Sequence, residues 1–411
     1  MRLCVCVVVL LSCAPGAAAQ SAAGPPLRLT EADAVARLQA NPRARALLAR
    51  VEEVRALQAE RASWPNPTAT FARESVFDAS DNFLLARQEL PITGRRQQLQ
   101  AAGRAAVDVA LADARFQTVQ LQAEVRHAFT ELALAQARED ELRTAIEELR
   151  KLIEVLRARE KEGEGSQYDR MRGERSLLDL ETDLALAAGG RAQAQGNLAA
   201  LLGVGIAPDT LIAADGLEPI TTQTSLPVLI EQAVATRADY RSTELSIAQF
   251  EAERLAAARF RVPTPTVAGG VKRSSNLLAV DTGYQFSVEL SLPLFNQGQA
   301  AGAAAAAQKA RAEAEAQYRR ARIEAEVRTA HARLAIQQQL ALRYRAATSA
   351  IAEPLARTGR VGYEEGELGI LELLDATRQA IDARVRVLEL TAAVRAAAID
   401  LDRVTGLEWK P

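Results

Sequence analysis

The sequence contains two copies of one pattern, in which prolines bracket a short strand region that lies between long helical stretches. Trp64-Pro65-Asn66-Pro67 returns as Val262-Pro263-Thr264-Pro265, and Leu90-Pro91 returns as Leu292-Pro293. The offset rises from 198 residues (Pro65 to Pro263) to 202 residues (Pro91 to Pro293), so the added residues lie between the proline markers of the second copy. Each copy reads as a hairpin that cannot bury its own surface, which means that neighbouring copies must complete the fold.

A very long helix is predicted in the first copy. No proline occurs between Pro91 and Pro208, and an apolar seam recurs at alternating spacings of four and three residues, which is typical of a coiled coil. The seam consists of Val107, Leu111, Ala114, Thr118, Leu121, Val125, Ala128, Leu132, Ala135, Glu139, Leu142, Ile146, Leu149, Ile153 and Leu156. A helix of roughly 65 residues would be about 100 Å long, which is too long for a compact domain.

Glycine-rich turns divide the helical stretches. The first turn comprises Gly163, Glu164, Gly165 and Ser166, and the second spans residues 362–369. These turns predict antiparallel helical hairpins over residues 94–202 and 297–403, with the turns at their tips. Pro354 should kink the outgoing helix of the second hairpin.

Two strand regions are predicted, residues 68–90 and 266–292, and the second shows the alternation of a membrane-barrel strand. The pattern is strict in the second copy, where Tyr284, Phe286, Val288 and Leu290 share one face and polar residues occupy the other, so the apolar face should meet lipid. The first copy alternates poorly. Because a sheet in lipid must leave no unpaired edge, four strands per chain require several chains, and three chains would supply twelve strands.

The repeats set the predicted domains: a signal peptide at 1–19, a first repeat at 20–207, a linker at 208–226 and a second repeat at 227–411. Residues 1–19 combine Arg2, an apolar stretch and a small-residue cleavage site before Gln20, and they hold all three cysteines (Cys4, Cys6 and Cys13). Cleavage after Ala19 is favoured. The alternative is lipidation of Cys13, since residues 10–13 also resemble a lipobox. No later apolar run is long enough for a spanning helix.

Composition argues against several classes of function. The formal net charge is −2 and the basic residues are dispersed, which argues against nucleic acid as a partner. The only histidines, His127 and His331, lie in helices without the neighbours that catalysis needs. With no cysteine after residue 13, a transition-metal site is not expected. Gly163-x-Gly165 follows a helix rather than a strand, so it is not a phosphate loop. We therefore expect no enzyme activity, no metal and no cofactor.

The chain resembles the TolC-like outer-membrane factor family over nearly all of the predicted mature sequence. The resemblance rests on the duplicated helix–hairpin–helix pattern, on Leu29-Thr30-Glu31-Ala32 followed by Asn41-Pro42, and on Leu-Pro after each strand pair. Its most specific part is the stretch Tyr363-Glu364-Glu365-Gly366-Glu367-Leu368-Gly369-Ile370-Leu371-Glu372-Leu373-Leu374-Asp375-Ala376. The resemblance implies a mainly α fold with a small membrane β part, in which a homotrimer forms a twelve-stranded β-barrel on a long α-helical barrel.

The resemblance also implies a function. The chain would be the outer-membrane exit duct of a tripartite efflux system, with a long periplasmic extension, and would work with a periplasmic adaptor and an inner-membrane pump in a Gram-negative bacterium. Its compact length is most similar to the CzcC-like heavy-metal branch. Two alternatives stay open: a duct for a type I polypeptide secretion system, and a structural periplasmic coiled-coil protein.

Candidate site residues follow from the same resemblance. Tyr363, Glu372, Asp375 and Asp169 would surround the periplasmic aperture, and the carboxylates of Glu372 and Asp375 would form an acidic ring. The alternative for these carboxylates is an ordinary solvated helix start. The adaptor would dock on the two hairpin tips, which consist of Gly163, Glu164, Gly165 and Ser166 in the first repeat and Gly366, Glu367, Leu368 and Gly369 in the second. Leu368 stands where relatives that latch the aperture can carry arginine, so any latch here must use other groups.

Overall fold

The computed structural model describes residues 25–218 and 224–407 of the chain. The predicted signal peptide and the alternative lipidation of Cys13 lie outside these residues. The elements up to residue 202 are β1 (Leu27–Leu29), α1 (Glu31–Ala36), α2 (Pro42–Arg61), β2 (Thr68–Val76), β3 (Ala79–Glu89), α3 (Arg95–Glu162) and α4 (Gln167–Leu202). The later elements are β4 (Leu211–Ala213), α5 (Leu226–Thr236), α6 (Ala238–Ala258), β5 (Pro265–Ser275), β6 (Val280–Leu290), α7 (Gln299–Ala347), α8 (Glu353–Glu364) and α9 (Ile370–Thr405).

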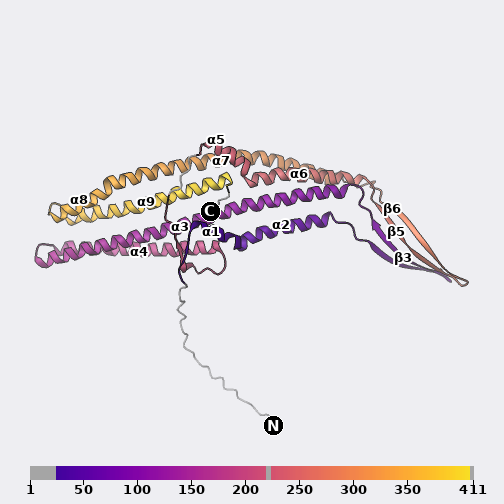
Figure 1. Ribbon diagram of the computed structural model, residues 1–411, viewed down its shortest axis with the longest axis horizontal. Helices are drawn as coiled ribbons and strands as arrows, with labels where there is room; N and C mark the ends of the chain where they lie inside the picture. The colour runs from indigo at the N-terminus through magenta and orange to yellow at the C-terminus, as the bar shows by residue number, and fades with distance from the viewer. Residues whose placement is uncertain (1–24, 219–223, 408–411) are drawn as a thin grey trace, which may run out of the picture.

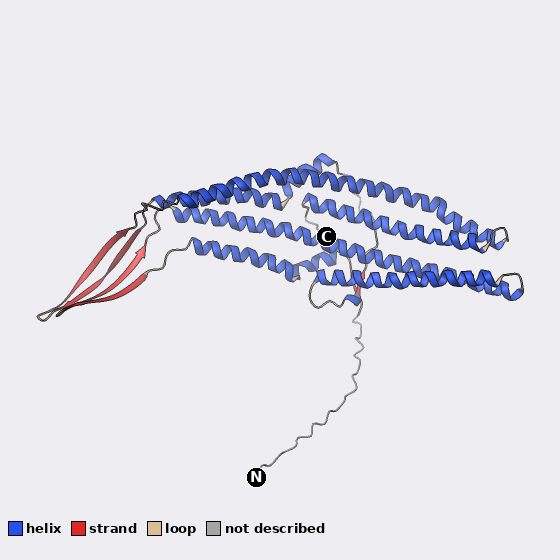
Figure 2. Ribbon diagram, turned by 180° about the vertical axis from the view of Figure 1, so that it is seen from behind, coloured by secondary structure: helices blue, strands red, loops and turns tan. Residues whose placement is uncertain are grey.

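The molecule is elongated, with a four-stranded sheet at one end and the tips of two helical hairpins at the other (Figures 1 and 2). Helix α3 has 68 residues, which corresponds to about 100 Å, and it runs through most of the helical body. Near the sheet α3 packs against α2 and α6, and toward the tips it packs against α4 and α9. The predicted duplication of helix, strand pair and helical hairpin is confirmed.

The predicted seam of α3 is largely the buried face of that helix. Leu121, Val125, Leu132, Leu149 and Leu156 are all buried, as is the polar seam residue Glu139. Leu111 differs, because it is partly exposed near the sheet end of the helix. The seam therefore identifies the surface on which the neighbouring helices pack.

The outgoing helix of the second hairpin is interrupted near Pro354. A π-helical turn at Thr348–Ala352 separates α7 from α8, and Pro354 lies at the start of α8. Proline has no backbone N–H to donate and its ring clashes with the carbonyl four residues earlier, so the regular hydrogen-bond pattern cannot continue through this point. The predicted irregularity is thus found one turn before the proline, as a widened turn of helix.

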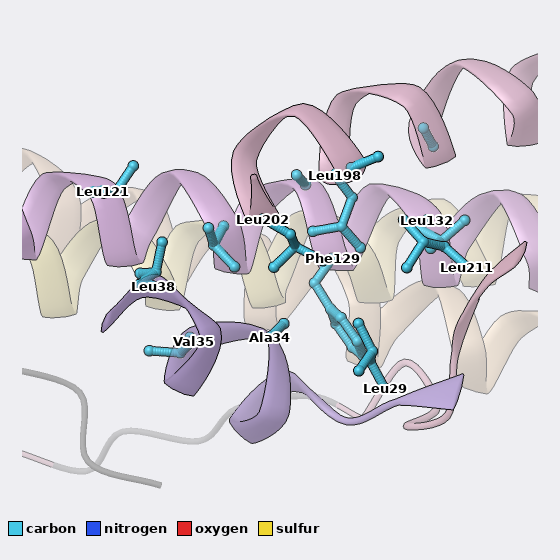
Figure 3. Packing of buried hydrophobic residues seen from close by; sticks show 14 residues of the cluster. Leu29, Ala34, Val35, Leu38, Leu121, Phe129, Leu132, Leu198, Leu202 and Leu211 are labelled. Carbon is cyan, nitrogen blue, oxygen red and sulfur yellow. The ribbon is translucent and has the colours of Figure 1, made fainter. Parts of the chain in front are cut away.

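A small core lies at mid-length on one side of the helical body. Strand β1 pairs in parallel with β4, with Leu27 opposite Leu211 and Leu29 opposite Ala213. Figure 3 shows Leu29 of β1 and Ala34 of α1 beside Phe129 of α3, which is fully buried. This two-stranded sheet was not predicted, and its strand β4 lies within the segment 208–226 that was expected to be a linker. The division into two repeats and a linker otherwise stays a prediction.

Candidate functional site

In the half next to the helices, the four-stranded sheet has one largely apolar face and one polar face; nearer the strand turns, Arg73, Asn82, Arg273 and Thr282 form a polar row on the first of these faces. The strand order of the sheet is β2-β3-β5-β6 and all neighbours are antiparallel, which leaves β2 and β6 as the two edges. Tyr284 lies opposite Val271, Val271 opposite Leu84, and Leu84 opposite Phe71. Directly opposed residues point to the same side of a sheet, so these four side chains form one continuous apolar row across all the strands.

A second row explains a glycine in this sheet. Phe286 of β6 lies opposite Gly269 of β5, and a Cβ added at Gly269 would lie 3.2 Å from the Phe286 ring. The ring therefore covers the space that a larger side chain at position 269 would need. Phe286, Tyr284 and Val288 are strongly exposed in the single chain, at 82%, 84% and 69% of their surface.

Two ion pairs lie on the opposite face of the sheet. Lys272 pairs with Asp81 at 2.7 Å, and Arg87 pairs with Glu289 at 3.5 Å. Both pairs link neighbouring or next-nearest strands on the side away from Phe286, as the alternation of a strand requires. Strand β3 alternates poorly in sequence because it places apolar residues on both faces: Leu84 lies on the apolar face, and Phe83 and Leu85 lie on the polar face.

The two hairpin tips end their outgoing helices in the same way. Gly163 and Gly366 have φ angles of 81° and 78°, in the left-handed region that glycine adopts readily. After Gly163, the N–H of Glu164 donates to the carbonyl of Arg159 at 2.9 Å. After Gly366, the N–H of Glu367 donates to the carbonyl of Gly362 at 2.8 Å. Both tips thus have the Schellman hydrogen-bond pattern, which satisfies carbonyls that a helix end leaves free.

The tips of the two hairpins meet through Arg159 and Tyr363. The Arg159 guanidinium carbon of α3 lies 5.5 Å from the centre of the Tyr363 ring of α8, and its Nη2 donates to the carbonyl of Glu364 at 3.1 Å. Tyr363 is buried. Burial and the negative charge of Asp169 raise the pKa of the Tyr363 hydroxyl, against the opposing effect of Arg159. The structure therefore brings Tyr363 and Asp169 of the predicted aperture group near one another, with Arg159 as a partner that sequence reasoning missed.

Leu368 fills space within the second tip. A Cβ added at Gly362 would lie 2.8 Å from a Leu368 methyl carbon, so the leucine side chain packs directly on that glycine. In this chain Leu368 contributes packing to the tip, whereas Arg159 provides the cationic contact between the hairpins.

Glu372 and Asp375 are exposed on the first turns of α9. A Cβ added at Gly369, the residue that precedes the helix, would lie 2.8 Å from Oε2 of Glu372, so this carboxylate folds back toward the start of α9. Asp375 accepts a hydrogen bond from Nε2 of Gln379 at 2.7 Å. The position of Glu372 suits the positive end of the helix dipole, as the alternative prediction of a solvated helix start requires.

A buried polar network at mid-length joins the two repeats. Nε of Arg126 donates to Oε1 of Glu31 at 2.6 Å, and Nη1 of Arg126 donates to Oδ2 of Asp402 at 2.9 Å. Arg395 of α9 donates to the other carboxylate oxygen of Glu31. Glu31 at the start of α1 thereby connects to α3 and to α9. Glu31 belongs to the stretch Leu29-Thr30-Glu31-Ala32 that carries the family resemblance, but no local pattern in the sequence indicates its pairing with Arg126 or Arg395.

The described part of the chain offers no group of three His, Cys, Asp or Glu side chains placed to hold a metal ion. Nε2 of His127 lies 3.3 Å from Oδ1 of Asp400, which gives this histidine a structural partner between α3 and α9. None of the helices in residues 25–218 and 224–407 combines the length and the apolar composition that a bilayer-spanning helix needs.

Comparisons with known proteins agree with this geometry. Residues 229–407 match the family model described as outer membrane efflux protein. No curated protein sequence matches the chain. A membrane protein from Pseudomonas aeruginosa is 21% identical with a TM-score of 0.76, covering 91% of this chain and 92% of that chain.

Two further solved structures are named as channels. The MtrE outer membrane channel of Neisseria gonorrhoeae, in its open state, is 19% identical with a TM-score of 0.75, covering 92% of this chain and 88% of that chain. The outer-membrane channel OprN is 20% identical with a TM-score of 0.74, covering 92% of this chain and 90% of that chain. Residues 229–407 therefore resemble the outer membrane efflux protein family, and the chain has the fold of these outer-membrane channels.

Proposed function

We propose that the chain is the outer-membrane exit duct of a tripartite efflux system, through which solutes delivered by an inner-membrane pump and a periplasmic adaptor leave the cell. The observation that carries this proposal is the apolar row from Phe71 to Tyr284, which crosses all four strands at the end of a helical body about 100 Å long. A sheet with one largely apolar face and one polar face suits a barrel wall between lipid and water. The family match of residues 229–407 supports the same function.

The assembly is proposed as a homotrimer. Edges β2 and β6 of the sheet are unpaired within the chain, and an open edge in lipid is very costly because water cannot satisfy its backbone groups. Pairing β6 of one copy with β2 of the next would remove both edges. Three copies would close a twelve-stranded barrel, with Tyr284, Phe286, Val288 and Leu290 facing outer-membrane lipid.

The helical body is proposed as a periplasmic extension of this barrel. The hairpin tips at its far end, around Gly163 and Gly366, would dock the adaptor, and the nearby Tyr363, Asp169, Glu372 and Asp375 would surround the aperture. In residues 25–218 and 224–407 no group of side chains forms a nucleotide site or a proton relay, so the energy for transport would come from the pump. The proposed role of the chain is containment and conduction, without enzyme activity.

Conductance of the purified protein tests the proposal. We expect detergent-extracted protein to have the mass of a trimer and to conduct ions after insertion into a planar lipid bilayer. A monomer that stays in the aqueous phase and gives no current would favour the rival interpretation, a periplasmic coiled-coil protein. Polypeptide secretion is the second rival. The transporter genes that lie beside this gene would separate it from solute efflux, because the pump selects the cargo.

A further inference from the structure

The four connections between helices and strands share an unusual charge. These connections, with the helix residues that flank them, are residues 61–67, 90–96, 259–264 and 291–298. They contain no aspartate or glutamate, and they contain five arginines: Arg61, Arg95, Arg96, Arg259 and Arg261. We call these five residues the junction arginines.

The junction arginines lie at one level of the molecule. The strand register places Arg87 opposite Thr68, Glu89 opposite Thr266 and Pro265 opposite Leu290, so all four strands meet their helices at the same end of the sheet. Figures 1 and 2 show this level as the boundary between the sheet and the helical body. In the proposed assembly it coincides with the periplasmic surface of the outer membrane.

Arg95 is poorly compensated at this boundary. Its guanidinium carbon lies 3.8 Å from the centre of the Phe260 ring, and its Nε is buried without a hydrogen-bond partner. Burial and the positive charge of Arg61 lower the pKa of Arg95, against the opposing effect of Glu89. Two positive charges are thus held near one another, and an anion beside them would relieve the repulsion.

The other junction arginines have few acidic partners. Arg259 approaches the start of α3, where a Cβ added at Gly94 would lie 3.9 Å from its guanidinium. Within the described residues, Arg259 and Arg261 form no ion pair and are exposed. Arg61 pairs with Glu253 at 3.5 Å, and Arg96 donates to the carbonyl of Ala62 at 2.8 Å. Glu253 pairs with Arg61 and Glu89 acts on Arg95, whereas Arg96, Arg259 and Arg261 form no ion pair among the described residues, so the boundary keeps an excess of positive charge.

Exposed apolar side chains stand beside these charges. Trp64 is half exposed and its ring centre lies 5.9 Å from the Arg96 guanidinium. Ile92, Leu294 and Phe295 are also strongly exposed, and they follow directly on the strand ends. Tryptophan is favoured where acyl chains meet headgroups. A guanidinium group can bind two oxygens of one phosphate at the same time. Apolar and cationic groups at one level match the two parts of an anionic phospholipid.

We propose that the junction arginines bind the phosphate headgroups of anionic phospholipids in the periplasmic leaflet of the outer membrane. Trp64, Ile92 and Phe295 contact the first part of the acyl chains. The lipid occupies the site because the five arginines supply charge complementarity that an uncharged or zwitterionic lipid lacks. This inference rests on the proposed placement of the sheet in the outer membrane.

Lipid retention by the intact trimer tests this site. The full chain is reconstituted in nanodiscs of phosphatidylethanolamine and phosphatidylglycerol, extracted in a neutral detergent, and examined for bound lipid by native mass spectrometry. We expect the wild type to retain phosphatidylglycerol in preference to phosphatidylethanolamine. In the variant Arg95→Gln/Arg259→Gln/Arg261→Gln, the ratio of retained phosphatidylglycerol to retained phosphatidylethanolamine should be at least five-fold lower than in the wild type. Equal retention by the variant and the wild type would overturn the proposal.

Three controls keep the result interpretable. The variant Arg150→Gln/Arg175→Gln/Arg386→Gln changes three exposed arginines of the helical hairpins and should retain lipid as the wild type does. Arg261→Gln alone should lower the preference for phosphatidylglycerol about two-fold. Because Arg261 is exposed and forms no ion pair among the described residues, this variant tests the site if the triple variant fails to fold. Complete displacement of the lipid by inorganic phosphate at millimolar concentration would identify a free-anion site and overturn the lipid assignment.

The test separates this inference from the proposed function. Current in a bilayer of phosphatidylcholine, which has no net charge, reports the channel without any anionic lipid. A wild type that conducts there but shows no preference for phosphatidylglycerol would overturn the lipid site and leave the duct intact. A wild type that neither inserts nor conducts would overturn the function itself.

Discussion

The guanidinium of Arg159 lies 5.5 Å from the ring centre of Tyr363, and this contact joins the tips of the two helical hairpins. Arg159 belongs to the last turn of α3, and Tyr363 to the last turn of α8. Each helix ends in a Schellman motif within four residues of this contact, at Gly163 for α3 and at Gly366 for α8. Arg159 and Tyr363 therefore both lie in the last helical turn before the tip. The contact can therefore restrain the tips against one another without an arginine at position 368.

Tyr363→Ala should loosen the tips and raise the single-channel conductance. The change removes a cation–π contact that is worth roughly 0.5–2 kcal/mol, together with the buried ring. Tyr318→Ala is the matched control, since Tyr318 is an exposed tyrosine of α7 away from the tips. An alanine variant at position 363 that assembles normally and conducts like the wild type would show that this contact does not limit the aperture.

The sequence predicted the elements of this tip but could not predict the contact. Proline-free stretches and glycine turns indicated the two hairpins, because helix interruption depends on local chemistry. Arg159 and Glu364, in contrast, are 205 positions apart, and their approach depends on how α3 and α8 pack. The same holds for Glu31 and Arg395, which are 364 positions apart. Pairing over such distances leaves no local pattern in a single sequence.

The sheet illustrates a second limit of prediction. Strict alternation around Tyr284 identified β6, whereas β3 alternates poorly because Phe83 and Leu85 occupy its polar face. The apolar row through Leu84 became visible only with the register. Strands β1 and β4 are three residues each, too short for any periodicity to show.

Leu149→Lys should destabilise the first hairpin. Leu149 is 3% exposed and packs in one cluster with Ile146, Ile153, Leu180 and Ile381, which come from both hairpins. A lysine there would lose apolar burial and leave a charge among methyl groups, at a cost of roughly 2–5 kcal/mol. The measurement is the midpoint of thermal unfolding.

Arg150→Ala is the control for that variant. Arg150 is exposed and pairs with Glu181 at 2.7 Å, and a surface ion pair of this kind contributes about 1 kcal/mol or less. Similar unfolding midpoints for Leu149→Lys and the wild type would mean that the hairpins do not depend on this cluster.

Val288→Arg and Ser287→Arg should differ in their effect on assembly. Val288 lies on the apolar face of β6 and Ser287 on the opposite face, so the same new side chain meets two environments. On a lipid-facing site near the membrane centre, arginine costs about 2–4 kcal/mol, whereas at a lumen site it is tolerated and changes conductance. The yield of trimer in the membrane fraction measures the difference. Equal yields would contradict the proposed orientation of the sheet.

Acid should weaken the junction between α6 and α7 through Asp239. Burial, the largest single effect, would raise the pKa of the Asp239 carboxyl, but the hydrogen bonds and charge of Arg237, the backbone N–H of Tyr240 and the charge of Arg319 together hold its pKa below the ordinary value of 3.8. A folded-state pKa below the unfolded one means that the stabilisation is fully present above about pH 4 and is lost as pH falls through the folded value. Asp239→Asn should lower stability by roughly 3 kcal/mol at pH 7 and flatten its decline in acid.

The measurement for Asp239 is the free energy of unfolding by denaturant at several pH values between 3 and 7. Asp382→Asn is a suitable control, because Asp382 is exposed and its pair with Arg378 lies at 3.3 Å on the surface of α9. If Asp239→Asn and the wild type lose stability in parallel as the pH falls, another group is responsible for the acid sensitivity.

The acidic ring proposed for the aperture gives the last prediction. Three copies of Glu372 and Asp375 around one narrow opening would repel one another and attract cations between them. A multivalent cation added from the periplasmic side should therefore block the current, and the block should weaken in high salt, where the charge of the ring is screened. Glu372→Ala/Asp375→Ala should reduce the block and the cation selectivity without lowering the amount of trimer.

Because the Glu372 carboxylate folds back toward Gly369 at the start of α9, the two substitutions should also be made singly. If Asp375→Ala alone removes the block, Glu372 acts as a helix-start carboxylate only. If the cation blocks the double variant with unchanged affinity, both Glu372 and Asp375 are ordinary helix-start carboxylates. The contact between Arg159 and Tyr363 would then be the group proposed to restrict the aperture.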